Sequence, residues 1–560
     1  MEKFADLVYR RPDVEALSQS IRDYTAALAK AGTAREVHDL LFAHKAAMAE
    51  FATMQTVASI RNTADTQNEF YEEEMAFFHR EVPRLSLLLR EADEALLASP
   101  FRGALEEELG ELYFRNLEVQ KQFADPRIVD DLVEESRLSQ LYSKTAATAS
   151  TFFRGEERNF YGLLKFMQST DRSTRREAFH AWAGLYARIA PELDDIYSRQ
   201  VRLRHGMARK LGFDSYTDMA YLRRRRYDYG PDDTASFRRQ VREIITPACL
   251  ELRRRQAQRL GVDALRYYDE SLIYPEGNPV PRGGREELVA KAQRMYREMS
   301  PETGEFFDCM VAHDLFDLET RPGKRPGGYC TALPAYKVPF IFSNFNGTSA
   351  DVDVLTHEAG HAFAGYTAFR SQPLPELTSS TSEICEIHSM TMEHFAYPWM
   401  ELFFGDEADK YRYAHLMDAL AVIPYMACVD EFQHRVYAQP EMTALERRQV
   451  WREIERVYMP WRDYDGDQFL EQGGFWMQKQ HIFLYPFYYI DYALAQIGAF
   501  QFYGRMKEDR AAAWSDYCQL CRRGGSLGYF QTLSSAGLDN PFQPGTVEKA
   551  VRGVFRDLGL

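Results

Sequence analysis

The sequence has few cysteines and no long apolar run. Seven cysteines are scattered over 560 residues, an odd number that fits a reducing compartment better than a disulfide framework. No run of eighteen apolar residues occurs, so we expect no membrane span. The N-terminal stretch MEKFADLVYRRPDVEAL lacks the basic-then-apolar pattern of a signal peptide. These absences together predict a cytoplasmic protein that works outside the membrane.

An excess of basic residues is lacking as well. The formal net charge is −15 and the pI is near 5.5, which argues against nucleic acid as a partner. Two local basic runs, Arg223 to Arg226 and Arg253 to Arg255, are expected to be solvated helix faces, with binding of an acidic group as the alternative. Cys518 and Cys521 form an isolated C-x-x-C. We expect helical burial there, because no second pair completes a zinc site.

Glycine and proline are sparse between residues 13 and 260. In this part, apolar residues recur at three- and four-residue spacing with charges between them, which predicts successive helices. Punctuated stretches at 274–286 and 320–334 read as loops. With 45% hydrophobic and 14% aromatic residues, the chain can bury a large core. The expected fold is mainly α with a minor strand component.

One strand is predicted directly before the most informative segment. KVPFIFSNFNGT, residues 337–348, is β-branched and aromatic, and it closes on the turn dipeptide Asn346-Gly347. Thr348 or Ser349 is a plausible N-cap for the helix that follows. The order is therefore strand, turn and helix. The edge of such a strand, at residues 340–345 or at the approach Gly327-Gly328-Tyr329, is a candidate for adding a peptide by main-chain hydrogen bonds.

The predicted helix carries VLTHEAGHAF, residues 354–363. His357 and His361 are four positions apart, so both imidazoles can point to one zinc ion from the same helix face. Glu358 lies one residue round the helix, where it can take a proton from water at the metal. Asp353, one turn earlier, is a candidate to hold a ring N–H of a ligand, although a first-turn acid explains it equally well.

A catalytic zinc takes three protein ligands. The metzincin pattern is excluded, because Ala364 and Thr367 stand where it requires glycine and histidine. The remaining option is a glutamate on a later helix.

The segment PELTSSTSEICEIHSMTMEHF, residues 375–395, supplies that glutamate. Ser380 and Glu383 have capping-box spacing, which predicts a helix start near 380 and favours a capping role for Glu383. Glu386 lies one turn further in, 25 positions after His361, where its side chain can reach a neighbouring helix.

This spacing, with EICEIHSM around it, resembles the thimet oligopeptidase and oligoendopeptidase F family of zinc peptidases. Residues 479–496 (KQHIFLYPFYYIDYALAQ) and 521–542 (CRRGGSLGYFQTLSSAGLDNPF) are similar to the C-terminal part of that family. The likeness is good over roughly residues 200–560, and the N-terminal part resembles the family mainly in being helical.

The resemblance implies one Zn²⁺ per chain held by His357, His361 and Glu386, with Glu358 as general base. It also implies a mainly α, thimet oligopeptidase/neurolysin-like zincin fold, with a small β-sheet and a deep substrate cleft between two helical halves. We expect residues 1–200 to cap the cleft and 201–560 to form the catalytic region.

The resemblance further implies that His481, Tyr489 and Tyr492 approach the scissile carbonyl. A phenol or imidazole N–H aimed at the oxyanion stabilises charge that exists only in the transition state. The alternative for this aromatic segment is a core helix. The sequence has IFLYPF, with Pro486, where animal members carry consecutive glycines, and this is similar to the bacterial oligoendopeptidase branch.

The function predicted from these features is a zinc-dependent endopeptidase that cleaves internal bonds of short peptide substrates. The first alternative is a zinc exopeptidase, which needs a group for the substrate's terminal charge that no motif identifies. The second is a non-catalytic peptide-binding protein, which has no use for a general base beside the metal.

Overall fold

The structure is a computed structural model that describes residues 1–560. Helices dominate and only five short strands occur, which confirms the expected fold class. The chain forms two compact units, each made of three segments. Unit 1 comprises Met1–Ala124, Val280–Ala408 and Arg505–Asp539, and unit 2 comprises Asp125–Pro279, Asp409–Gly504 and Asn540–Leu560.

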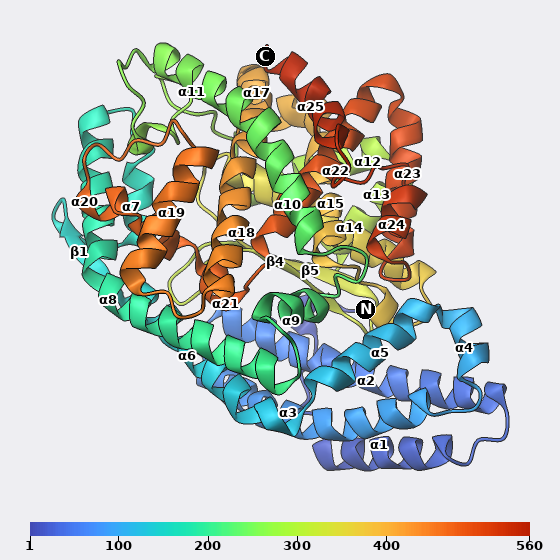
Figure 1. The fold of residues 1–560 in the computed structure, drawn as a ribbon. Coiled ribbons are helices and arrows are strands. Elements are labelled where there is room, and N and C mark those ends of the chain that lie inside the picture. The colour runs from blue at the N-terminus through green and yellow to red at the C-terminus, as the bar shows by residue number, and fades with distance from the viewer. The chain divides into compact units, whose positions relative to one another are not determined.

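Each unit has its own set of elements (Figure 1). Those of unit 1 are α1 (Val14–Leu28), α2 (Ala34–Ala64), α3 (Glu69–Leu97), α4 (Arg102–Leu109), α5 (Glu111–Phe123), α12 (Arg285–Met299), α13 (Pro301–Ala312), β3 (Phe316–Glu319), β4 (Tyr329–Leu333), β5 (Val338–Phe345), α14 (Ala350–Ser371), α15 (Ser382–Phe395), α16 (Met400–Phe404), α23 (Arg510–Arg523) and α24 (Tyr529–Ser535). Those of unit 2 are α6 (Val129–Thr148), β1 (Ser150–Phe153), β2 (Glu156–Asn159), α7 (Phe160–Phe166), α8 (Arg172–Lys210), α9 (Tyr216–Arg223), α10 (Pro231–Gln240), α11 (Thr246–Leu260), α18 (Ile423–Ala438), α19 (Ala444–Tyr458), α20 (Gln468–Glu471), α21 (Gln480–Leu484) and α25 (Thr546–Asp557). Two helices, α17 (Ala408–Ala421) and α22 (Tyr489–Glu508), contain residues of both units.

The division expected at residue 200 falls within α8. As a statement about which part of the chain caps a cleft, it stays a prediction.

The three-stranded sheet of unit 1 has the order β3-β5-β4. The expected strand at 337–348 is β5, and it pairs in parallel with β3 and antiparallel with β4. The expectation that residues 340–345 offer a free edge is therefore wrong, because β5 is paired on both sides. The outer strands are β3 and β4, and β4 follows the approach at Gly327-Gly328. Helix α14 packs against both β5 and β4.

Helices α1, α2 and α3 lie side by side in unit 1 (Figure 1). Their buried apolar residues form one cluster with those of α4 and α5, and Leu374 and Leu377 from the loop between α14 and α15 join it. The Gly525 N–H donates to the Leu377 carbonyl at 2.8 Å. A β-carbon on Gly524 would lie 2.3 Å from that carbonyl oxygen. The loop joining α14 to α15 is thus held from two sides.

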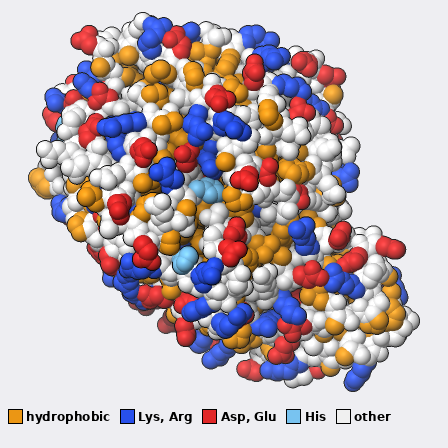
Figure 2. Space-filling view, viewed as in Figure 1, with side chains coloured by type: hydrophobic (Ala, Val, Ile, Leu, Met, Phe, Trp, Pro, Cys, Tyr) orange, Lys and Arg blue, Asp and Glu red, His pale blue; other side chains and the backbone are white.

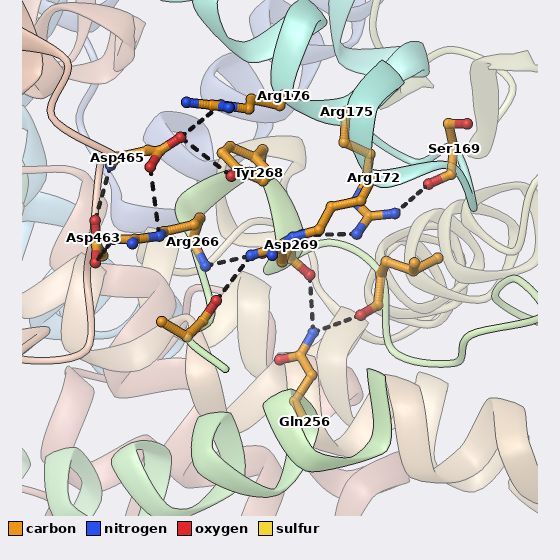
Figure 3. A network of polar contacts seen from close by, with 12 residues as sticks. Ser169, Arg172, Arg175, Arg176, Gln256, Arg266, Tyr268, Asp269, Asp463 and Asp465 are labelled. Atoms are coloured by element: carbon orange, nitrogen blue, oxygen red, sulfur yellow. Dashed lines mark hydrogen bonds and ion pairs between the residues drawn. The ribbon is translucent and has the colours of Figure 1, made fainter. Parts of the chain in front are cut away.

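Unit 2 is crossed by a network of ion pairs (Figure 3). Asp269 is fully buried and accepts hydrogen bonds at 2.7 Å from both Arg172 and Arg175 of α8. Nearby, Asp465 pairs with Arg176 at 2.8 Å. These contacts tie α8 to two loops that are remote from it in sequence. Removing one partner of such a buried ion pair leaves the other charge unpaired, which lowers the free energy of unfolding.

The basic run at 223–226 is solvated only in part, since Arg223 and Arg225 are exposed whereas Arg226 is buried. Arg224 and Arg226 both pair with Asp491, and Arg223 lies 3.7 Å from Glu135. Arg225 alone is exposed without such a contact. The expectation is wrong for Arg224 and Arg226, because charge spacing along a sequence does not reveal a buried carboxylate on a distant helix.

The second run, at 253–255, is divided. Arg253 is buried and lies 3.7 Å from Glu270, whereas Arg254 stays more than half exposed and pairs with Glu251 of its own helix. Cys518 and Cys521 are both buried on α23, as expected.

On the face in Figure 2, basic and acidic side chains are interspersed. None of the helices combines the length and the hydropathy needed to cross a bilayer.

Candidate metal centre and its surroundings

The segment before the metal motif folds as the sequence predicts. Strand β5 ends at Phe345 and α14 begins at Ala350. The backbone N–H groups of Asn346 and Gly347 donate to the Asp351 carboxylate at 2.9 and 2.8 Å. Neither Thr348 nor Ser349 caps the helix with its side chain, since Ser349 is the N-cap residue without such a bond. The hydrogen bonds to Asp351 instead stabilise the turn that connects β5 to α14.

Three side chains of unit 1 converge beside this helix. Nε2 of His357 and Nε2 of His361 each lie 3.4 Å from Oε2 of Glu386. One ligand atom from each of the three residues can be chosen so that all lie within 4.8 Å of one another. The two imidazoles are nearly perpendicular, with ring centroids 5.0 Å apart. Two ring nitrogens and one carboxylate oxygen are the donor set of a catalytic zinc site, so the residues present fit that ion.

Helix α15 brings Glu386 to this position, but not by the expected cap. The helix begins at Ser382, close to the predicted start, and its N-cap Thr381 makes no side-chain capping bond. Because the N-cap residue is Thr381 and not Ser380, the predicted capping box of Ser380 with Glu383 is wrong; Glu383 itself is buried. Ser389, one turn along α15, donates from Oγ to Oε2 of Glu386 at 3.1 Å.

The close approach of α14 and α15 depends on a glycine. A β-carbon on Gly360 would lie 2.6 Å from Cα of Ser389 and 2.8 Å from the carbonyl oxygen of His388. No L side chain fits there without moving one helix. Gly360 stands between the two histidines in HEAGH, so the glycine itself is visible in the sequence. That a helix packs closely against it is visible only in the structure.

A second residue that sequence reasoning missed is Glu393. Its Oε1 lies 2.6 Å from Nδ1 of His357, and its side chain is 13% exposed. The ring partner of His357 is therefore a glutamate two turns along α15, rather than Asp353 of its own helix. A carboxylate on the outer ring nitrogen fixes both the tautomer and the direction of a metal-binding imidazole.

Glu358 lies beside the three converging groups without joining them. Its residue is 8% exposed. Burial raises the pKa of its carboxyl above the ordinary value, while the imidazoles of His357 and His361 oppose that rise. A β-carbon on Gly328, just before β4, would lie 3.7 Å from Oε1 of Glu358. The carboxylate thus lies near the start of β4, at a position without a side chain.

The electrostatics of Glu386 and His388 differ, although the two are close in sequence. Burial alone would raise the pKa of Glu386, but the two facing imidazoles bring it well below the ordinary value. Burial lowers the pKa of His388 to about 3, which agrees with a neutral core histidine. A negative carboxylate facing two imidazoles is the arrangement that a divalent cation completes.

The predicted C-terminal residues gather in unit 2. The ring of His481 lies 4.9 Å from that of Tyr489, 6.0 Å from that of Tyr492 and 5.7 Å from that of Tyr488. Tyr489 is buried, and its hydroxyl accepts a hydrogen bond from Lys479 at 3.0 Å. Tyr492 is only partly buried. Sequence reasoning therefore selected residues that form one cluster on α21, α22 and the turn between them.

Comparison with known proteins gives matches along the whole chain. A family model described as the peptidase M3 N-terminal domain matches residues 4–124, and that of peptidase family M3 matches residues 165–273 and 303–551. An oligoendopeptidase F homolog of Borreliella burgdorferi is 27% identical over 232 residues, which are 40% of this chain and 38% of that relative. The match thus spans well under two thirds of that curated relative.

Solved structures match more closely. A chain assigned to oligoendopeptidase F is 46% identical with a TM-score of 0.94, and the match covers 100% of both chains. PZ peptidase A, solved with an inhibitor, is 45% identical with a TM-score of 0.94, covering 100% of this chain and 99% of that one.

Proposed function

The chain belongs to peptidase family M3, and we propose that it is a zinc-dependent endopeptidase that hydrolyses internal bonds of short oligopeptides. The observation that carries this proposal is the convergence of His357, His361 and Glu386, with ligand atoms within 4.8 Å of one another and Glu358 alongside. The curated relative named as an oligoendopeptidase F homolog supports the class of substrate.

In the proposed reaction His357, His361 and Glu386 hold one zinc ion, which when bound supplies Lewis acidity to water and to the scissile carbonyl. Glu358 accepts a proton from the attacking water and returns it to the leaving amine. Glu358 is largely buried, and its raised pKa suits a group that both takes and gives a proton. A glutamine at this position keeps the shape but cannot carry the proton.

His481, Tyr492 and Tyr489 are proposed to donate hydrogen bonds to the oxyanion of the tetrahedral intermediate. Of the two tyrosines, Tyr492 is the better candidate, because it is only partly buried whereas Tyr489 is 8% exposed. These side chains are proposed to line a deep cleft, whose narrowness limits substrates to short peptides.

The peptide main chain is proposed to run along β4. This strand pairs only with β5, and its approach at Gly328 lies next to Glu358. Main-chain hydrogen bonds to a strand edge bind a peptide without regard to its sequence, which suits a peptidase of broad specificity.

The test is mass-spectrometric cleavage of a mixture of short and long peptides, with casein alongside and Glu358→Gln as control. Internal cuts confined to short peptides, absent in the variant, are expected. Cuts only at the ends of peptides would indicate an exopeptidase instead. Equal cleavage by wild type and variant would reject the catalytic role of Glu358, and absence of cleavage by both would leave a peptide-binding protein.

A further inference from the structure

The segment that carries His481 and the tyrosines contains a buried residue in an unusual backbone conformation. Phe487 has φ +61° and is fully buried. The left-handed region is disfavoured for a bulky side chain, and such residues persist only where their surroundings hold them. Because the residue in this conformation is Phe487 and not a glycine, contacts with other parts of the protein are needed to hold its backbone.

Those contacts come from two side chains of unit 2. The N–H of Phe487 donates to Oε1 of Gln433 on α18 at 2.9 Å. Its carbonyl oxygen accepts a hydrogen bond from Nη2 of Arg226. Both polar groups of one peptide residue are therefore bound by side chains from distant parts of the sequence. The conformation is fixed by tertiary contacts rather than by local preference.

Arg226 also reaches the first turn of α22. Its Nη2 lies 2.5 Å from Oδ1 of Asp491, and Nη2 of Arg224 lies 2.9 Å from Oδ2 of the same carboxylate. The Asp491 side chain is 1% exposed and stands between Tyr489 and Tyr492 in sequence. One buried carboxylate held by two guanidinium groups thus anchors the helical turn that presents both tyrosines.

Arg226 itself has little freedom. Its side chain is fully buried, and its guanidinium carbon lies 4.5 Å from the ring centroid of Tyr221 and 5.6 Å from that of Tyr229. Tyr221 in turn bonds Thr234 at 2.8 Å. A planar guanidinium packed against two aromatic rings has less freedom than a lysine ammonium.

We propose that Arg226 is a positioning residue for the reaction: by binding the Phe487 carbonyl and the Asp491 carboxylate together, it fixes the direction in which Tyr492 and His481 point. Arg224 assists, since it shares Asp491 and lies 4.6 Å from the ring centroid of Tyr488. This inference rests on the proposed function, because it assigns a purpose to the same tyrosine and histidine.

The contacts of Arg226 pre-organise the segment that carries His481 and Tyr492. A loop with glycine hinges must order itself each time the transition state forms, whereas a clamped loop holds its donors in place beforehand. Misplacing a catalytic group by about 1 Å costs on the order of 100-fold in rate. Loss of the clamp should therefore lower kcat while leaving KM and zinc binding close to those of the wild type.

The test compares Arg226→Met with Arg225→Met, the exposed neighbour in the same run. We expect kcat to fall by about 10- to 100-fold in Arg226→Met, with KM changed less than about threefold and zinc content unchanged. Arg225→Met should match wild type in all three. Arg224→Met, whose parent side chain is 18% exposed, provides a milder break should Arg226→Met fold poorly, and it should lower kcat in the same way.

A double-mutant cycle with Tyr492→Phe separates positioning from general support. If Arg226 acts through Tyr492, adding Arg226→Met to Tyr492→Phe lowers kcat by a much smaller factor than adding it to wild type. Factors that multiply fully would overturn the proposal, as would a folded Arg226→Met with the kcat of wild type.

A measurement independent of activity completes the test. Hydrogen exchange should become faster over residues 485–492 in Arg226→Met and not in Arg225→Met, and unchanged exchange would overturn the clamp. Failure of the proposed function is distinct, because it would appear as equal cleavage by wild type and Glu358→Gln, whatever Arg226 does.

Discussion

Gly360 and Ser389 lie so close that a β-carbon on the glycine would approach Cα of the serine to 2.6 Å. This is where α14 and α15 cross, between the two histidines on one helix and beside Glu386 on the other. The distance between the helices therefore sets whether three ligand atoms can converge.

Gly360→Ala is expected to weaken zinc binding by at least about tenfold, because α15 must move away and carry Glu386 with it. The measurement is competition with a chromogenic chelator. The matched control is Gly365→Ala on the same helix, where an added β-carbon meets nothing within 4 Å. Equal zinc affinity in the two variants would show that the crossing tolerates the added atom and that this account is wrong.

Glu393→Gln is expected to weaken zinc binding about 10- to 100-fold, since the amide cannot hold the His357 ring N–H as a carboxylate does. Chelator competition again gives the affinity, and Glu302→Gln on the exposed face of α13 serves as control. Turnover at saturating zinc should recover most of the loss. Unchanged affinity would mean that the contact of 2.6 Å between Glu393 and His357 has no influence on the metal.

Asp269→Asn is expected to destabilise the protein by about 3–5 kcal/mol, because it leaves the buried Arg175 guanidinium without its carboxylate. Urea unfolding followed by circular dichroism measures the change. Asp214→Asn provides a control, since that side chain is fully exposed. A similar midpoint for both variants would contradict the importance of the network in Figure 3.

His44 makes stability depend on pH. Burial lowers its pKa to about 4, and its ring stacks on Tyr24 with centroids 4.2 Å apart. In the unfolded chain a histidine titrates near pH 6.5, so on acidification the unfolded state takes up the proton first. Stability contributed by the neutral ring is present above pH 6.5 and is lost as the pH falls toward 4.

Between pH 7 and pH 5 this loss amounts to roughly 2 kcal/mol. In His44→Phe, which keeps the stacked ring, that part of the pH dependence should vanish. Urea midpoints at the two pH values, compared between variant and wild type, measure it. An equal loss of stability between pH 7 and pH 5 in both proteins would show that groups other than His44 cause the acid sensitivity.

Local sequence patterns predicted the elements around the metal centre well. Helical periodicity, the strand at 337–348 and the helix bearing His357 and His361 all correspond to observed elements, because each depends on interactions within a few residues. The start of α15 was predicted within two residues of Ser382. The capping box that suggested it does not form at Ser380, since Thr381 is the N-cap residue.

Contacts between distant segments were not predictable in the same way. Glu393 on His357, the pairing of β5 on both sides, and the burial of Arg224 and Arg226 against Asp491 each join residues far apart in the sequence. A single sequence does not show which side chains that are distant along the chain come into contact in the fold. The basic run therefore read as a solvated face, when it holds the turn before α22.

The sequence by itself determined the chemistry available to this protein: two histidines on one helix face, a glutamate beside them and another 25 positions on. Side-chain type and helical spacing suffice for that, because both are local properties. Only the tertiary structure decided how closely α14 and α15 cross, which carboxylate holds His357, and how Phe487 is kept in a conformation it would not adopt alone. These depend on close packing and buried charge between remote segments, which exist only once the chain has folded.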